Sequence, residues 1–159
     1  MSAALQVSVR AATRDDLALV ASCHHAAHIA IQDARGGELE TLLNGRQEPQ
    51  EESWRPYVGA TDRSLLLGEL DDTVVGYCAL EHLELVNNTS IAMISELWVH
   101  PDARGVGIGA ALMREIEATA RQWGATGLDS RALPGDRTTK NFFESFGLVA
   151  RAIHVHRKL

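Results

Sequence analysis

The chain has 159 residues, of which 45% are hydrophobic and 23% are charged, and it carries a formal net charge of −6 at pH 7. This composition is typical of a globular domain, and the negative balance disfavours nucleic acid as a partner and mildly favours a cationic acceptor. Because no stretch resembles a signal peptide or approaches the roughly 18 apolar residues of a membrane span, we expect a single cytoplasmic domain over residues 1–159 with no membrane partner.

Hydrophobic periodicity predicts strands and helices that alternate along the chain. In chain order these are a strand at 6–12, helices at 13–34 and 38–44, strands at 64–70, 73–86 and 91–99, a helix at 107–123, a strand at 126–132, a helix at 136–146 and a strand at 148–157. Thr13 and Asp16 have the spacing of a helix cap. Residues 45–60 contain two prolines and are expected to form a loop or a broken helix.

The helix at 107–123 has the clearest pattern of all these elements. Its apolar residues form one stripe at helical spacing, which consists of Ile108, Leu112, Ile116, Ala120 and Trp123. Gly124 follows as a natural C-terminal stop. We therefore expect this helix to pack one face against a sheet.

Residues 94–110, ISELWVHPDARGVGIGA, run from a strand through a turn into a glycine-rich loop that opens this helix. Gly105, Gly107 and Gly109 let the backbone approach a ligand, and the first N–H groups of the helix are unpaired donors with a partial positive charge behind them. Arg104 adds a planar group of donors that suits phosphate oxygens. This segment therefore predicts a site for a phosphate or pyrophosphate.

Two common phosphate-binding motifs do not fit this segment. A dinucleotide-binding GxGxxG motif would need a third glycine where the chain has Ala110, and the P-loop would need a GK[ST] sequence that does not follow. The pattern that fits is RxxGxG, formed by Arg104, Gly107 and Gly109 directly after a strand. It resembles the acetyl-CoA signature of the GNAT superfamily of N-acetyltransferases, and the likeness extends over ELWVHPDARGVGIGAALM without a gap.

The resemblance covers nearly the whole chain and implies an α/β fold of the α+β type. Its mixed, mostly antiparallel sheet would have six to seven strands and about four flanking helices, and it would splay after the strand that carries Glu96. The resemblance also implies acetyl-CoA as cosubstrate, with its pantetheine on that strand and its pyrophosphate on the loop. The residues implied are Leu97, Trp98 and Val99 for the pantetheine, and Arg104, Gly105, Val106, Gly107, Ile108, Gly109 and Ala110 for the pyrophosphate.

A second family motif, NxxAxxFYEKxGF, corresponds to DRTTKNFFESFGL at 136–148, where Asp136 replaces the asparagine. The resemblance implies that Phe142 and Phe143 line the cofactor site. Phe143 stands where relatives often have a tyrosine that protonates the departing thiolate, and phenylalanine cannot donate a proton. The alternatives left open for this proton are Ser145, Tyr77, Tyr57 and a water molecule.

Glu96 is the candidate catalytic residue. An alkylamine such as lysine has a pKa of about 10.4 and is mostly protonated near pH 7, so its attack on a thioester needs a base. Glu96 precedes the cofactor-binding backbone, where it would take the proton directly or through a water and would titrate between about pH 6 and 9. The structural alternative is that Glu96 pairs with a side chain of a neighbouring strand or is solvated. A backbone N–H near Val99 would stabilise the oxygen that gains negative charge.

His24 and His28 have the i,i+4 spacing that can present two ligands to one metal ion. No carboxylate or cysteine of convincing spacing accompanies them in the sequence. We therefore expect no metal site, and we interpret His24 as a partly buried helix residue on the acceptor side.

The sequence thus predicts an N-acetyltransferase that moves an acetyl group from acetyl-CoA to a primary amine by direct transfer in a ternary complex. The acceptor would be a small-molecule amine or a peptide amine, and a homodimer paired through C-terminal strands is compatible with the family. Two hypotheses of another class stay open. One is a catalytically weak acyl-CoA-binding or sensor protein of the same fold, and the other is a nucleotide-binding module that uses the loop for ATP or NAD phosphates.

Overall fold

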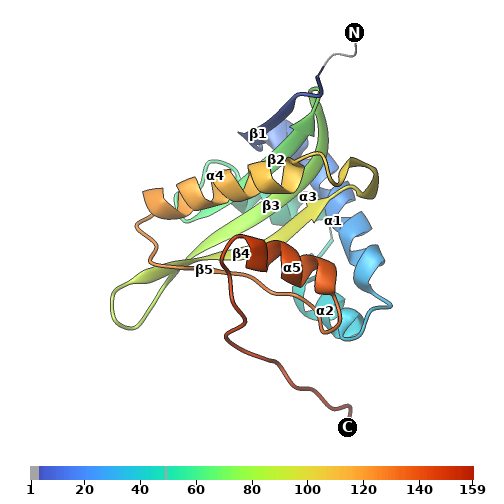
Figure 1. Ribbon diagram of the computed structural model, residues 1–159, viewed down its shortest axis with the longest axis vertical. Helices are drawn as coiled ribbons and strands as arrows, with labels where there is room; N and C mark the ends of the chain where they lie inside the picture. Colours follow the sequence, from blue (N-terminus) through green and yellow to red (C-terminus); the bar gives the residue numbers. More distant parts are fainter. Residues whose placement is uncertain (1–3, 49) are drawn as a thin grey trace.

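A five-stranded sheet forms the centre of the computed structural model, which describes residues 4–48 and 50–159 (Figure 1). The strands lie side by side in sequence order and are β1 (Val7–Ala11), β2 (Arg63–Leu70), β3 (Thr73–Glu84), β4 (Ser90–Val99) and β5 (Leu128–Asp129). Neighbours are antiparallel from β1 to β4, and β5 runs parallel to β4. The mixed, mostly antiparallel sheet agrees with the expectation, but the described residues form five strands rather than six to seven.

Five α-helices flank the sheet within the described residues, rather than about four. They are α1 (Leu17–Ile31), α2 (Gly37–Asn44), α3 (Gln50–Trp54), α4 (Ile108–Gln122) and α5 (Arg137–Ser145). The additional helix is α3, which continues into a 3-10 turn at Arg55–Tyr57, so the segment at 45–60 is a broken helix. The cap before α1 is confirmed, because the Thr13 N–H donates to Asp16 Oδ2 at 2.7 Å. None of the described helices is long and apolar enough to cross a membrane.

The helix α4 packs across one face of the sheet through the stripe that its sequence predicts. The buried members of the stripe are Ile108, Leu112, Ile116 and Ala120. The helix approaches closely because two strand glycines lie beneath it. A Cβ added at Gly68 would lie 2.7 Å from Ile108 Cγ2, and one at Gly76 would lie 3.3 Å from the same atom. These glycines therefore let the first turn of α4, and the loop before it, sit against the sheet.

The opposite face of the sheet is covered by α1 and α3. Side chains alternate between the faces of a strand, so Leu66 of β2 belongs to the core under α4, whereas its neighbour Leu67 belongs to a second core. The second core includes Val20 of α1 and Trp54 of α3, both fully buried, together with Tyr77 of β3. The two faces thus carry separate apolar cores, and polar side chains of β4 on the second face lie next to α1.

The strands β4 and β5 separate after a short stretch of pairing. Their parallel register joins two residue pairs, at Ala92 and Met93 of β4, and no further pairing between them occurs in the described residues. On its other side β4 stays paired with β3 as far as Val99, with Ser95 unpaired in the register as a bulge just before Glu96. The side of β4 that faces β5 is therefore unpaired over residues 96–99, and we call this stretch the open edge. It corresponds to the expected splay of the sheet.

The strand predicted at 148–157 does not form, and the predicted strand at 126–132 shortens to β5. Alternating apolar residues of this tail, which are Val149, Ile153 and Val155, are exposed. The tail contacts the rest of the chain through ion pairs of Arg151 with Asp129 and of Lys158 with Glu38. A strand needs a neighbouring edge for its hydrogen bonds, and among the described residues the tail does not pair with one.

Candidate active site

The glycine loop between β4 and α4 has the geometry of an anion site. Gly105 and Gly107 have φ angles of 81° and 100°, in the left-handed region that glycine adopts without strain. The first backbone bond of α4 runs from the N–H of Ala111 to the carbonyl of Gly107, so the N–H groups of residues 108–110 have no partner within the helix. A Cβ added at Gly105 or Gly107 would meet no heavy atom within 4 Å. The loop therefore offers both donors and room for a phosphate.

Gly109 differs from the other two glycines of the loop. A Cβ added at Gly109 would lie 2.9 Å from Cε2 of Phe142 on α5. The glycine is required here by close packing rather than by a left-handed backbone. This contact brings α5 alongside the first turn of α4 (Figure 1) and places Phe142 next to the predicted cofactor loop.

The open edge of β4 presents the peptide groups of Leu97 and Val99. The N–H of His100 donates to a β3 carbonyl at 2.7 Å, and peptide groups alternate in direction along a strand. Val99 and Leu97 therefore direct their peptide groups away from β3, whereas Trp98 directs its own toward β3. Arg104 Nε donates to the Val99 carbonyl at 3.1 Å, and its two Nη groups make no hydrogen bond within the described residues. The guanidinium is thus held where the strand meets the loop.

Glu96 lies beside the bulge, and its buried carboxylate belongs to a polar network. Oε2 accepts from Tyr77 OH at 2.6 Å and lies 2.9 Å from His24 Nδ1, and Oε1 lies 3.7 Å from Arg46 Nη2. Burial raises the pKa of Glu96, but the hydrogen bonds from His24 and Tyr77 and the charges of His24 and Arg46 outweigh it, so the pKa lies below its usual value.

Two expectations about Glu96 change as a result. The expectation that Glu96 titrates between about pH 6 and 9 is wrong, because these partners keep the carboxylate ionised throughout that range. The structural alternative, pairing with a side chain of a neighbouring strand, is present through Tyr77 of β3. Glu96 is therefore a largely buried carboxylate that is ionised near neutral pH. Because its pKa is low, a proton that it receives is quickly transferred to another acceptor.

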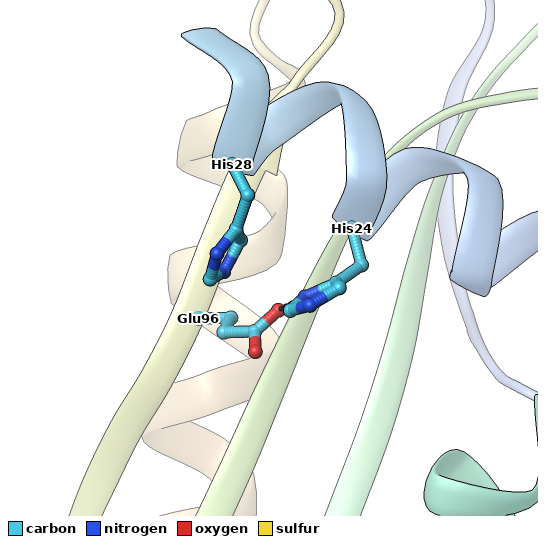
Figure 2. A group of neighbouring side chains, drawn as sticks. All are labelled: His24, His28 and Glu96. Carbon is cyan, nitrogen blue, oxygen red and sulfur yellow. Dashed lines mark hydrogen bonds and ion pairs between the residues drawn. The ribbon is translucent and has the colours of Figure 1, made fainter. Parts of the chain in front are cut away.

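Figure 2 shows His24 and His28, one turn apart on α1, beside Glu96 of β4. His24 is 1% exposed, so it is fully buried rather than partly buried. Its ring centroid lies 4.0 Å from that of His28, and the potential ligand atoms of the three residues lie within 4.8 Å of one another. The carboxylate partner that the local sequence lacks is thus Glu96, which is separated from His24 by 72 residues in sequence.

The surroundings of this cluster favour proton handling over metal binding. Glu96 Oε2 already carries two contacts, and the Arg46 guanidinium, 3.7 Å from Oε1, repels a divalent metal ion about twice as strongly as a singly charged group. Burial and the neighbouring His24 lower the pKa of His28, so its imidazole is neutral near pH 7 and can accept a proton. We therefore interpret the cluster as a network that relays protons.

Arg46 is a member of the candidate site that the sequence analysis did not name. It lies on the segment after α2, its guanidinium carbon is 3.8 Å from the centre of the Trp54 ring, and its Nη2 donates to Tyr57 OH at 3.2 Å. The only sequence signal was an arginine near two aromatic residues in an irregular segment. Its proximity to Glu96 arises from the packing of α3 against α1 and could not be read from spacing.

A pocket with a volume of about 390 Å³ opens beside Glu96. Its lining comes from the end of α2 and the segment after it, from β3 and β4, and from the chain after β5. It consists of Leu43, Asn44, Gly45, Arg46, Glu81, Leu83, Met93, Ser95, Glu96 and Arg131. We call this hollow the Glu96 pocket. Its volume is near the lower end of the range for small-molecule sites, about 300 to 1,000 Å³.

The model of the acetyltransferase (GNAT) family matches residues 30–148, which include the glycine loop, Glu96 and the Phe142 contact. The chain belongs to this family. The resemblance noted in the RxxGxG pattern is thereby confirmed. No curated protein sequence gives a significant match.

Solved structures share the fold at low sequence identity. A tetramutant of the BH1408 protein from Bacillus halodurans is 19% identical, with a TM-score of 0.78 over 96% of this chain and 99% of that chain. A ribosomal-protein-alanine N-acetyltransferase from Brucella melitensis biovar Abortus 2308 is 17% identical, with a TM-score of 0.68 over 98% and 100%. The aminoglycoside N-acetyltransferase AAC(6')-Iy in complex with CoA is 12% identical, with a TM-score of 0.75 over 99% and 98%. At these identities the likeness establishes a GNAT-like fold.

The tyrosine position of the second GNAT motif is occupied by Phe143, which is 7% exposed and belongs to the core under α4. Asp136, which replaces the motif's asparagine, still caps α5 by accepting from the Thr139 N–H at 3.0 Å. The hydroxyls suggested as substitutes all donate to protein acceptors: Tyr77 to Glu96, Tyr57 to Glu81 and Ser145 to the Phe142 carbonyl. Water is therefore the alternative that the geometry favours for protonating the thiolate.

We expect Phe143→Tyr to lower the free energy of unfolding by about 1 to 3 kcal/mol and to change kcat/KM by less than about tenfold. The added hydroxyl is buried at the edge of an apolar core, where stability is lost unless the hydroxyl is hydrogen-bonded. Denaturant unfolding and steady-state kinetics measure the two effects. A gain in kcat/KM of about a hundredfold, the scale of a general acid, would contradict this placement of Phe143.

Proposed function

We propose that this chain is an N-acetyltransferase that moves the acetyl group of acetyl-CoA directly to a primary amine in a ternary complex. One observation carries the proposal: a candidate phosphate site, an open strand edge and a largely buried carboxylate lie together at the end of β4. The phosphate site is the start of α4, the edge presents Leu97 and Val99, and the carboxylate is Glu96 beside its pocket. These are the parts that an acetyl transfer from a CoA thioester to an amine requires.

The loop and the open edge fit the two polar regions of acetyl-CoA. In the proposal, the backbone N–H groups from Arg104 to Ala110 hold the pyrophosphate, and the guanidinium of Arg104 adds charge-assisted bonds. The peptide group of Leu97 and the carbonyl of Val99 pair with the amides of the pantetheine, as an added strand would, which leaves the N–H of Val99 for the thioester. When bound, acetyl-CoA supplies the thioester carbon that the acceptor amine attacks.

Glu96 holds the acceptor ammonium and receives its proton, directly or through a water. A carboxylate with a lowered pKa is a weak base, so the proton does not stay there and passes toward the neutral imidazole of His28 and solvent. The N–H of Val99, which lies on the open edge, donates to the oxygen that gains negative charge. A water protonates the departing sulfur, because the nearby hydroxyls are already donating elsewhere.

The experiment that tests this function measures free thiol released from acetyl-CoA across a panel of amines, with the acetylated product identified by mass spectrometry. We expect turnover with at least one amine, above the rate of thioester hydrolysis. Binding of acetyl-CoA without turnover on any amine would favour the acyl-CoA binder or sensor. Binding of ATP or NAD in place of acetyl-CoA would favour the nucleotide-binding module.

Arg104→Ala should raise the Kd for acetyl-CoA by about tenfold to a hundredfold, because a charge-assisted hydrogen bond contributes about 1.5 to 3 kcal/mol. Calorimetric titration measures the change, and kcat at saturating acetyl-CoA should change little. Arg121→Ala is the matched control, since Arg121 lies in the last turn of α4, at the end away from the loop that carries Arg104, and pairs with Glu117 on the surface. Equal affinities for the parent and the Arg104 variant would remove Arg104 from the site.

A further inference from the structure

Two arginines, Arg46 and Arg131, line the Glu96 pocket, and they differ in the contacts that they make within the protein. Arg46 is committed to the protein, since it stacks on Trp54, donates to Tyr57 and lies beside Glu96. Its side chain is 18% exposed. Arg46 therefore partly neutralises the Glu96 carboxylate, and its contacts within the protein make it a poorer partner for a ligand anion than Arg131.

Arg131, by contrast, is more exposed and makes only a long contact with a carboxylate. Its side chain is 45% exposed, and the nearest carboxylate oxygen, on Glu40, lies 3.7 Å from Nη2, which is long for a hydrogen bond. That same oxygen already accepts from Asn44 Nδ2 at 2.8 Å. Arg131 thus lines the pocket with planar donors available to a ligand anion. Carboxylate and phosphate both match a guanidinium, but Glu81 and Glu96 in the same lining disfavour the more highly charged phosphate.

The pocket also presents negative charge and apolar surface. Glu96 and Glu81, which accepts from Tyr57, supply carboxylates that attract an ammonium group. Leu43, Leu83 and Met93 supply apolar walls. A ligand that satisfies all three features carries an ammonium, a carboxylate and an apolar side chain in a small volume.

We infer that the acceptor is a free amino acid with an apolar side chain, whose carboxylate pairs with Arg131 and whose ammonium lies against Glu96. The inference rests on the N-acetyltransferase function proposed above and names the substrate class of that site. Polycationic amines fit less well, because both guanidinium groups repel additional positive charge and the volume of about 390 Å³ is small.

The reaction at this site is balanced in atoms and charge. A bond forms between the amino nitrogen and the acetyl carbonyl carbon while the carbon–sulfur bond breaks. The ammonium loses two protons in the reaction. One passes through Glu96 to solvent, and the other is balanced by the proton that the thiolate takes from water to become the CoA thiol. The carboxylate of the acceptor takes no part in the chemistry, so Arg131 is a specificity-determining residue.

The test compares leucine with 3-methylbutylamine, which is leucine without its carboxylate, and with the polyamine spermidine. We expect kcat/KM for leucine to exceed that for 3-methylbutylamine by about tenfold to a hundredfold, the contribution of one charge-assisted interaction. Arg131→Met should remove this preference by raising the KM for leucine and leaving kcat and the Kd for acetyl-CoA unchanged. Calorimetric titration of leucine into the protein saturated with CoA gives the same comparison without turnover.

The control is Arg121→Met, which removes a guanidinium from the surface of α4 and should leave the leucine preference intact. Equal turnover and binding of leucine and 3-methylbutylamine, or a preference for spermidine, would overturn the amino-acid assignment and leave the acetyltransferase function standing. Absence of thiol release with every amine would overturn the acetyltransferase function instead. In that case, leucine binding that is lost in Arg131→Met would still support the Glu96 pocket as an amino-acid site. Leucine binding that is equal in the parent and in Arg131→Met would overturn it.

Discussion

Replacing Glu96 by glutamine lowers kcat/KM at pH 7 by about a hundredfold or more, near the lower end of the 10² to 10⁴ range for acid–base residues, while the Kd for acetyl-CoA stays close to that of the parent. The amide has almost the same shape but cannot hold the ammonium by charge or receive its proton. The lower end is expected because the partners of Glu96 lower its pKa and make it a weak base. Steady-state kinetics and calorimetric titration at the same temperature measure the two quantities.

The pH profile distinguishes this role from that of a group that titrates near neutrality. The pKa of Glu96 lies below its usual value of 4.5, so the carboxylate is ionised across pH 6 to 9. The parent's kcat/KM should therefore rise with pH only as the acceptor ammonium and His28 lose their protons. The stabilising contribution of Glu96 is present above pH 4.5 and is lost as pH falls through its folded-state pKa, so unfolding should become easier in acid in the parent and less so in the Glu96→Gln variant.

Tyr77→Phe is the matched control for the Glu96 variant, because it removes one hydrogen bond from Oε2 and keeps the carboxylate. We expect it to lower kcat/KM by less than about tenfold, well below the effect of losing a catalytic proton acceptor. A Glu96→Gln variant that keeps the parent's kcat/KM would assign the proton to water or to His28. A loss as large in Tyr77→Phe as in Glu96→Gln would show that the intact hydrogen-bond network, rather than proton acceptance by the Glu96 carboxylate, accounts for the loss.

Replacing Gly107 by valine should raise the Kd for acetyl-CoA by more than about a hundredfold, since more than one charge-assisted bond of about 1.5 to 3 kcal/mol is lost. Gly107 has a φ of 100° and caps α4, so a β-branched residue there strains the backbone that aims the loop N–H groups. The new side chain would also enter the open space in front of the loop, where a Cβ now meets nothing within 4 Å.

Gly124→Val is the control that distinguishes backbone strain from the loss of acetyl-CoA contacts in Gly107→Val. Gly124 follows the other end of α4, has a φ of 71°, and a Cβ there also meets nothing within 4 Å. Both variants should lose about 1 to 2 kcal/mol of stability from the left-handed backbone, measured by denaturant unfolding, but only Gly107→Val should lose acetyl-CoA. Normal binding by a folded Gly107→Val protein would move the pyrophosphate site away from this loop.

Local features of the fold could be predicted because their causes are local. The stripe of α4 follows from apolar residues at helical spacing, and the turn between β2 and β3 follows from Asp71 and Asp72, which adopt positive φ angles. The strand expected at 148–157 failed for a non-local reason. Its alternation suits a strand, but alternation does not supply a partner edge, and the tail stays exposed.

The family and the glycine loop could be predicted from the sequence, because Arg104, Gly107 and Gly109 lie at a characteristic spacing within one strand–loop–helix unit. The lowered pKa of Glu96, by contrast, could not be predicted from the sequence, because it depends on side chains that folding brings together. The contact of Glu96 with His24 spans 72 residues and exists because α1 packs on the face of the sheet that carries both Tyr77 and Glu96. Burial and charge depend on such neighbours, so the pKa of a side chain and the contents of a pocket become known only when distant segments are brought together.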